Sequence, residues 1–154
     1  MLDEPILCPK TDDANPVSNQ NPSIREDIHG LLRQEPFGVL CTQGEGQPYG
    51  SVVAYAFTQD LSALFFATST ATRKYCLLSA CNQVAMVVDN RDRFPNDLMS
   101  TSAVTITGRA NQVKVGPDFE RWAHLLTERH PYLESFIESP PLPFSGSKLS
   151  ATYT

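Results

Sequence analysis

The chain has 154 residues, a formal net charge of −5 at pH 7 and a pI of about 5.1. With only 12 Lys and Arg residues it lacks the basic surface that nucleic-acid phosphates require, so nucleic acid is not an expected partner. Neither a membrane span nor secretion is expected, because no apolar run is long enough and the N-terminus has no signal pattern. The sequence therefore predicts a cytoplasmic protein with one globular domain.

The spacing of the cysteine and histidine residues does not indicate a metal centre. The four cysteines form no C-x-x-C pair, and the three histidines have no ligand partner nearby in the sequence. Cys41 and Cys76 are expected to be buried as small apolar side chains.

The N-terminal region predicts a tail followed by a helix. Residues 1–22 contain four prolines and no hydrophobic periodicity, so they are expected to form a mobile tail before a single domain at 23–154. Ser23 and Glu26 fit a capping box at the start of a helix that Pro36 ends. The apolar stripe of this helix consists of Ile24, Ile28, Leu31 and Leu32.

Three strands with short connections follow. They are expected at Phe37–Thr42, Tyr49–Phe57 and Ala63–Thr68, and the first connection is a glycine- and proline-containing turn at 44–48. Segments joined so closely favour an antiparallel meander. Tyr49, Tyr55 and Phe57 share one face of the second strand, where they either border a ligand or pack in the core.

A helix over Ala71–Ala80, capped by Ser69 or Thr70, precedes a fourth strand at Gln83–Asp89. The continuous apolar run of that strand indicates burial on both faces, as in a barrel or a dimer interface.

The remaining segments complete the predicted fold. After a polar loop at 90–100, a long strand is expected at Thr101–Val115, and Pro117 opens a helix in which Trp122 packs against the core. A short helical stretch at 131–138, an extended linker at 140–143 and a last strand at Lys148–Tyr153 follow. The fold class is therefore mainly β with flanking helices, a six-stranded antiparallel barrel.

One segment carries recognisable chemistry. Hydroxyl side chains and two adjacent cations lie at the end of the third strand and the start of the predicted helix, in the segment from Thr68 to Lys74. Cations at a helix N-terminus oppose the helix dipole unless an anion is present. A phosphate there would meet free N–H groups, hydroxyls and positive charge together. The alternative is an ordinary helix start in which both cations face water.

The ordered series of motifs resembles the pyridoxamine 5′-phosphate oxidase-like FMN-binding split barrels. The motifs that carry the resemblance are Phe37–Thr42, the Gly46-Gln47-Pro48 turn, Phe66–Ser69 leading to Thr72-Arg73-Lys74, Asn82–Asp89 and Val104-x-Ile106-x-Gly108-Arg109-Ala110. The resemblance spans roughly residues 24 to 130 and implies a split barrel of the FMN-binding type. It also implies a homodimer in which each flavin lies at the subunit interface.

The resemblance assigns cofactor contacts residue by residue. Backbone groups along the second strand would run beside the flavin ring and ribityl chain, and the cation cluster would hold the phosphate. The partner chain would close the pocket near Ala103. The cofactor-binding residues implied in this way are Gly50, Ser51, Val52, Val53, Ala54, Tyr55, Ala67, Thr68, Ser69, Thr72, Arg73, Lys74 and Ala103.

Departures from the family pattern narrow the function. Gly50 and Tyr55 carry no charge where the oxidases have basic contacts, a glutamine near Ala103 is missing, and the C-terminal substrate-binding segment is absent. The sequence therefore predicts an FMN-dependent oxidoreductase that does not oxidise pyridoxamine phosphate, with unnamed catalytic residues and a small-molecule substrate or nicotinamide electron donor. Haem and deazaflavin F420 are the alternative ligands, and flavin binding without turnover is the alternative role. The Arg91–Met99 loop is compatible with haem as the ligand.

Overall fold

The computed structural model describes residues 22–138 and, for the backbone alone, residues 144–153. Residues 1–21 of the expected tail and the expected linker at 140–143 lie outside the described residues, so the domain limits stay a prediction. No helix in the described part of the chain is long and apolar enough to span a membrane.

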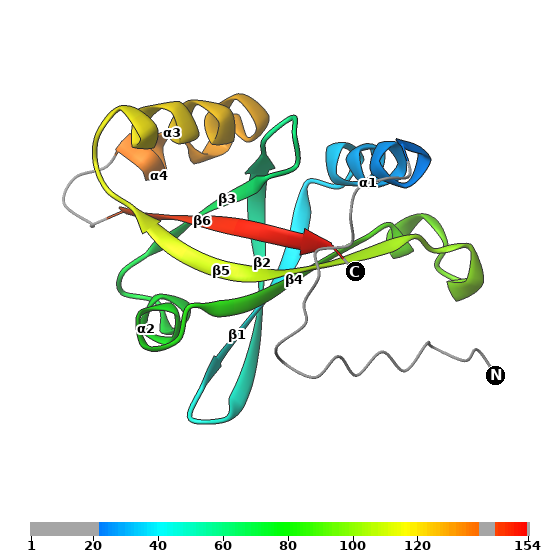
Figure 1. Cartoon of the computed structure of the whole chain (residues 1–154), viewed down its shortest axis with the longest axis horizontal. Coiled ribbons are helices and arrows are strands. Elements are labelled where there is room, and N and C mark those ends of the chain that lie inside the picture. The colour runs from blue at the N-terminus through cyan, green and yellow to red at the C-terminus, as the bar shows by residue number, and fades with distance from the viewer. Residues whose placement is uncertain (1–21, 139–143, 154) are drawn as a thin grey trace.

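The expectation of a mainly β protein with flanking helices is confirmed (Figure 1). The helices are α1 (Pro22–Gln34), α2 (Arg73–Ala80), α3 (Pro117–Arg129) and α4 (Glu134–Glu138). The strands are β1 (Phe37–Gly44), β2 (Gln47–Phe57), β3 (Ala63–Ser69), β4 (Gln83–Asp89), β5 (Ala103–Val113) and β6 (Phe144–Tyr153).

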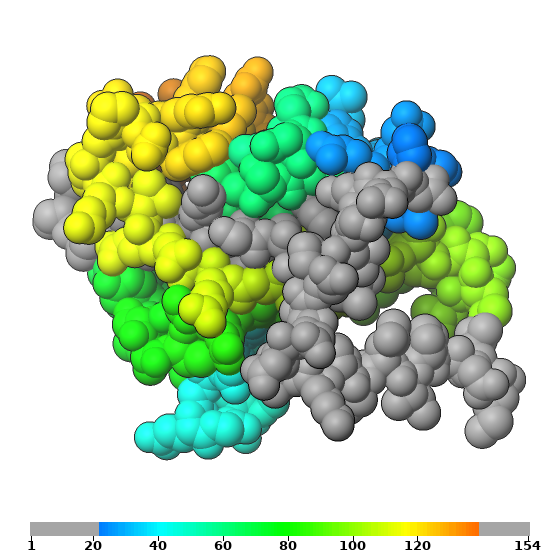
Figure 2. Space-filling view, in the orientation of Figure 1, coloured from blue at the N-terminus to red at the C-terminus, as the bar shows by residue number. Residues whose placement is uncertain are grey.

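The strands pair in the antiparallel sense and close into a barrel in the order β1-β2-β3-β6-β5-β4. In Figure 1, α3 and α4 lie above the barrel and α2 lies below it, next to β1. The hairpin that joins β1 to β2 projects from the body of the molecule, as its cyan surface in Figure 2 shows. Its tight turn places Glu45 and Gly46 at positive φ.

Two predicted helix starts are wrong by a few residues. α1 begins at Pro22, so Ser23 lies inside its first turn instead of capping it. α2 begins at Arg73, and its N-cap is Thr72 instead of Ser69 or Thr70. The physical reason is that the Ser69 carbonyl accepts both the N–H and the hydroxyl of Thr72, which keeps 69–72 in a turn.

Smaller boundary differences occur toward the C-terminus. β5 is shorter than the predicted strand at both ends, whereas β6 begins at Phe144, four residues before the predicted start. The stretch 131–138 consists of a 3-10 turn at Pro131–Leu133 followed by α4. The polar loop after β4 contains two further 3-10 turns, at Arg91–Arg93 and Leu98–Ser100.

The inward side chains of the strands form one core. It includes Leu40, Val53, Tyr55, Leu64, Phe66, Val84, Met86, Val88, Val104 and Ile106. Trp122 stacks on Phe65 with ring centroids 3.5 Å apart, which agrees with the expected packing of α3 on the barrel. The expectation of buried cysteines is wrong for Cys76, which is exposed because the inner face of α2 is formed by its neighbour Leu77; Cys41 is half-buried.

Buried polar groups join α1, β2 and α3. The Tyr55 hydroxyl shares its single proton between two carbonyls at the end of α1, those of Glu35 (2.7 Å) and Leu32 (3.0 Å). Arg129 donates to the same two carbonyls, at 2.5 and 2.7 Å. These groups supply the partners that the last carbonyls of a helix lack.

Replacing Tyr55 by Phe removes the hydroxyl but keeps the ring in the core. We expect Tyr55→Phe to lower the free energy of unfolding by about 0.5–1.5 kcal/mol, because one buried donor is lost while Arg129 still serves both carbonyls. Urea denaturation measures the change. Tyr132→Phe is the control, since this exposed hydroxyl has only a 3.4 Å contact with His130 and its loss should cost less than about 0.5 kcal/mol.

His130 gives the fold a predictable pH dependence. Its Nε2–H donates to the Tyr55 carbonyl at 2.9 Å, and burial, helped by Arg129, lowers the pKa of the imidazole below its ordinary value. The unfolded chain therefore binds this proton at a higher pH than the folded chain does, so stability is lost as pH falls through about 6.5.

We expect the free energy of unfolding to decrease between about pH 7.5 and about pH 5.5, and the decrease to be smaller in His130→Gln. Denaturant melts at several pH values test this. His124→Gln is the control, because His124 is exposed, and equal slopes in all three proteins would contradict the assignment.

Candidate functional site

The hydroxyl groups of Thr68, near the end of β3, and Thr72, at the N-cap of α2, are hydrogen-bonded to each other. Thr72 Oγ1 donates to the Ser69 carbonyl at 2.8 Å and accepts the N–H of Tyr75 at 3.2 Å. Because that donation uses the single Thr72 proton, the buried Thr68 hydroxyl is the donor in the 2.9 Å Thr68–Thr72 contact. Both threonines therefore shape the turn.

Ser69 has a different arrangement. Its Oγ accepts the N–H of Ala71 at 3.2 Å, which leaves the hydroxyl proton available to a ligand. Ala67, also assigned to the site by the resemblance, lies half-buried near the end of β3. Of the three predicted hydroxyl contacts, Ser69 is the one whose geometry suits donation to an anion.

The two cations follow directly at the first positions of α2. Arg73 is exposed, and its Cζ lies 5.0 Å from the centre of the Tyr49 ring. Lys74 is half-buried, and burial lowers the pKa of its ammonium group. The ion pairs found among the described residues involve Arg91 and Arg93, not these two cations. The first N–H groups of a helix also lack carbonyl partners within it.

Electrostatically, this turn therefore concentrates positive charge. Two side-chain cations, unused helix N–H groups and one hydroxyl proton lie within a few residues, without a carboxylate paired to them in the described chain. Such a donor set can bind a phosphoryl group by charge-assisted hydrogen bonds. In the part of the chain that the structure describes, His, Cys, Asp and Glu form no group that could hold a metal ion.

The predicted contacts on β2 divide between the two faces of the strand. Gly50, Val52 and Ala54 lie on the outer face, and the Val52 side chain is 69% exposed. Ser51, Val53 and Tyr55 point inward, so a ligand outside the barrel could reach only their backbone groups.

Tyr55 is engaged inside the protein. Its ring is fully buried, its hydroxyl bonds to α1, and its carbonyl accepts from His130. Of the two alternatives for this side chain, core packing is therefore the one observed. Phe57 packs beside it, with ring centroids 6.3 Å apart, whereas Tyr49 lies under Arg73.

Ala103 is not brought to the phosphate cluster of the same chain. It pairs with Asp89 at the far end of β4, whereas α2 leads into the opposite end of that strand at Gln83. Six residues of extended strand correspond to roughly 20 Å. Along β4, Ala103 is therefore remote from the end of the strand at which α2 joins it.

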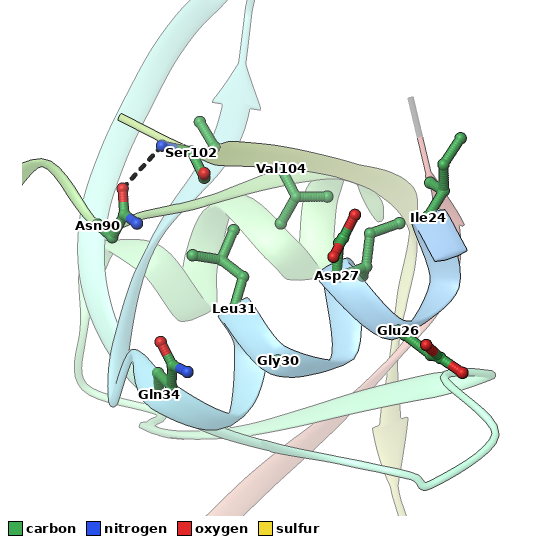
Figure 3. Close-up of a pocket in the computed structure, with 11 residues that line it drawn as sticks. Ile24, Glu26, Asp27, Gly30, Leu31, Gln34, Asn90, Ser102 and Val104 are labelled. Atoms are coloured by element: carbon green, nitrogen blue, oxygen red, sulfur yellow. Dashed lines mark hydrogen bonds between the residues drawn. The ribbon is translucent and has the colours of Figure 1, made fainter. Parts of the chain in front are cut away.

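Ala103 lines a groove of about 620 Å³ between α1 and β5 (Figure 3). Leu31 of α1 and Val104 of β5 contribute apolar walls, and Asp27 projects from α1 on the same side as Leu31. At one end, the N–H of Ser102 donates to Asn90 Oδ1 at 2.7 Å, which fixes the chain where β5 begins.

A second hollow, of about 340 Å³, lies on the outer face of the barrel. Its lining includes Val39, Val52 and Val87, which pair laterally across β1, β2 and β4. An apolar row of this kind on an exposed strand face is typical of a protein interface.

The sequence did not indicate two features around this site. The contact of Tyr49 with Arg73 joins residues 24 positions apart, and hydrophobic periodicity carries no signal for it. The polar junction of Arg129 with α1 likewise joins distant segments. The sequence pattern placed the aromatic residues of β2 on one face. Only the structure shows that Tyr55 packs in the core and that Tyr49 contacts Arg73.

The structure is an antiparallel β-barrel with flanking helices and a phosphate-compatible turn between β3 and α2. Residues 24–145 match the family described as pyridoxamine 5′-phosphate oxidase, and the chain belongs to that family. Comparison of the sequence with curated proteins finds no match.

Solved structures show the same fold at low sequence identity. A heme binding protein from Mycobacterium smegmatis superposes with a TM-score of 0.73 and 19% identity over 85% of this chain, which spans only 52% of that protein. A heme storage protein from Vibrio cholerae gives 0.71 and 16%, covering 82% of this chain and 88% of the other. An FAD-binding protein from Mesorhizobium loti gives 0.63 and 16%, with the same two coverages of 82% and 88%.

Proposed function

We propose that this protein is a cytoplasmic FMN-binding flavoprotein, a homodimeric six-stranded split barrel of the FMN-binding type that acts as an oxidoreductase. The observation that carries the proposal is the turn between β3 and α2. There Arg73 and Lys74 stand beside a free hydroxyl proton and the first N–H groups of a helix, with no carboxylate paired to them among the described residues.

The chain's own residues would have separate tasks toward the cofactor. Arg73 offers a planar fork and Lys74 a compact charge to the phosphate, while Ser69 donates its hydroxyl proton. The outward edge of β2 at Gly50 and Val52 would lie beside the ring system. The flavin, when bound, supplies the electron-transfer chemistry, and the barrel orients it and limits access of water.

The placement of the two ends of the site supports the proposal of a homodimer. Ala103 lies at the opposite end of β4 from the phosphate cluster, so a partner related by two-fold symmetry would supply it. The valine row on the outer face gives such a partner an apolar contact surface. The groove between α1 and β5 borders the same strand end and is open to a small-molecule substrate or a nicotinamide donor.

Oxidation of pyridoxamine phosphate itself is not the proposed activity. Tyr55 points into the core and Gly50 has no side chain, so neither supplies the basic contact that the family resemblance leads us to expect there. The solved relatives named as heme- and FAD-binding proteins make haem and other flavins the competing ligands, together with F420 or a flavin held without turnover.

Replacing both cations at the turn should abolish tight FMN binding. Each charged hydrogen bond contributes about 1.5–3 kcal/mol, so Arg73→Ala/Lys74→Ala should weaken FMN affinity by at least about 100-fold. The affinity for riboflavin, which lacks the phosphate, should fall much less in the same double variant. The affinities for FMN and riboflavin are each measured by the change in flavin fluorescence on titration with the purified protein.

The matched control is Arg109→Ala/Lys114→Ala, which removes the same charge from exposed positions and should leave FMN binding unchanged. The absorption spectrum and the mass of the released ligand identify the natural cofactor. A haem or deazaflavin signature, or a double variant with full FMN occupancy, would overturn the FMN assignment. Oxidation of NADH or NADPH by the loaded protein separates an oxidoreductase from a flavin carrier.

The proposed interface has its own test. Val52→Arg places a charge in the middle of the valine row, and burying an unpaired charge in an apolar interface strongly opposes association. We expect sedimentation velocity to show a dimer for the original chain and a monomer for Val52→Arg, with weaker FMN binding by the monomer. Val115→Arg is the control, because Val115 is 89% exposed beyond the end of β5; a dimer that survives Val52→Arg excludes this face as the interface.

A further inference from the structure

The Tyr49 ring lies beneath one of the proposed phosphate-binding cations. Tyr49 stands near the start of β2, where its backbone pairs with Thr42 of β1. The buried Thr42 hydroxyl donates to the Tyr49 carbonyl at 3.2 Å. This side-chain bond across the hairpin fixes the backbone from which the half-buried Tyr49 ring projects.

Close packing of α2 on the hairpin brings Arg73 to this ring. Gly44, at the end of β1, has no Cβ, and a Cβ placed there would collide with the side chain of Leu77 in α2. Leu77 follows Arg73 by four residues, so both project from the same face of the helix. The Leu77 side chain therefore fills the space beside Gly44 and packs α2 against the hairpin on the helix face that carries Arg73.

The contact orients an otherwise unrestrained cation. Arg73 is exposed, and no carboxylate in the described part of the chain pairs with it. With Cζ 5.0 Å from the ring centre, the guanidinium is within the range of a cation–π contact. Such a contact leaves N–H groups of the guanidinium free to form a bidentate pair with a phosphate.

We propose that Tyr49 is a positioning residue that holds the Arg73 guanidinium ready for the phosphate and thereby contributes to the selection of a phosphorylated flavin over an unphosphorylated one. The inference rests on the proposed function. Tyr49 acts through Arg73 and need not touch the ligand. Lys74 is half-buried one position along the helix, and the cation–π contact with the ring is made by Arg73.

The test compares Tyr49→Leu, which removes the π face, with Tyr49→Phe, which keeps it. We expect Tyr49→Leu to weaken FMN affinity about two- to fivefold while riboflavin affinity stays unchanged, so that the ratio of the two falls. Tyr49→Phe should restore the original ratio. A general loosening of the hairpin would lower the affinity for both flavins equally. The thermal unfolding temperature of each variant reports such loosening independently.

A double-mutant cycle makes the test specific to the pair. In an Arg73→Ala background, Tyr49→Leu should no longer change FMN affinity, because the cation that the ring positions is gone. The inference is overturned if Tyr49→Leu leaves the FMN-to-riboflavin ratio unchanged, or if its effect persists without Arg73. If the original chain and Arg73→Ala/Lys74→Ala bind FMN equally, the proposed function itself fails, whereas a failure confined to Tyr49 leaves that function intact.

Discussion

The end of α1 is the point on which the arrangement of the helices depends. The carbonyls of Leu32, in its last turn, and of Glu35, directly after it, accept from Tyr55 in the core of the barrel and from Arg129 at the end of α3. Unpaired, these buried carbonyls would each cost desolvation free energy comparable to a lost hydrogen bond. By donating to these carbonyls, Tyr55 and Arg129 allow α1 to end in a buried position against the barrel.

The end of α1 also contacts the loop after β4. Arg93 pairs with the buried Glu35 carboxylate at 2.7 Å and donates to the Gln34 side chain at 2.8 Å. The chain between β4 and β5 is thereby tied to α1, close to where Asn90 and Ser102 fix the start of β5. The position of Ala103 thus depends on polar contacts that begin at the end of α1.

Much of the fold could be predicted from local patterns, because strand alternation and turn residues are local properties. The hairpins and the helix of Trp122 followed from periodicity and from glycine and proline positions. The cap of α2 could not be chosen from composition, since Ser69, Thr70 and Thr72 are all suitable types and only the turn geometry selects Thr72.

Contacts between distant segments were beyond sequence reasoning for a different reason. Arg129 meets Leu32 across 97 positions, and one chain offers no pattern that pairs them. At the candidate site, the adjacent cations were visible in the sequence, but the division of the hydroxyls into two that build the turn and one with a free proton was not.

The charge distribution is compatible with the proposed anion site, although the protein as a whole is acidic. A net charge of −5 disfavours anions in general, yet long-range repulsion between exposed charges is screened within about 10 Å at moderate salt. Local donors therefore decide the outcome. Burial already penalises the charged form of Lys74, and an anion seated beside it would raise its pKa again. Because that gain arises only when a negative group is present, it adds to the proposed affinity of the turn between β3 and α2 for a phosphate.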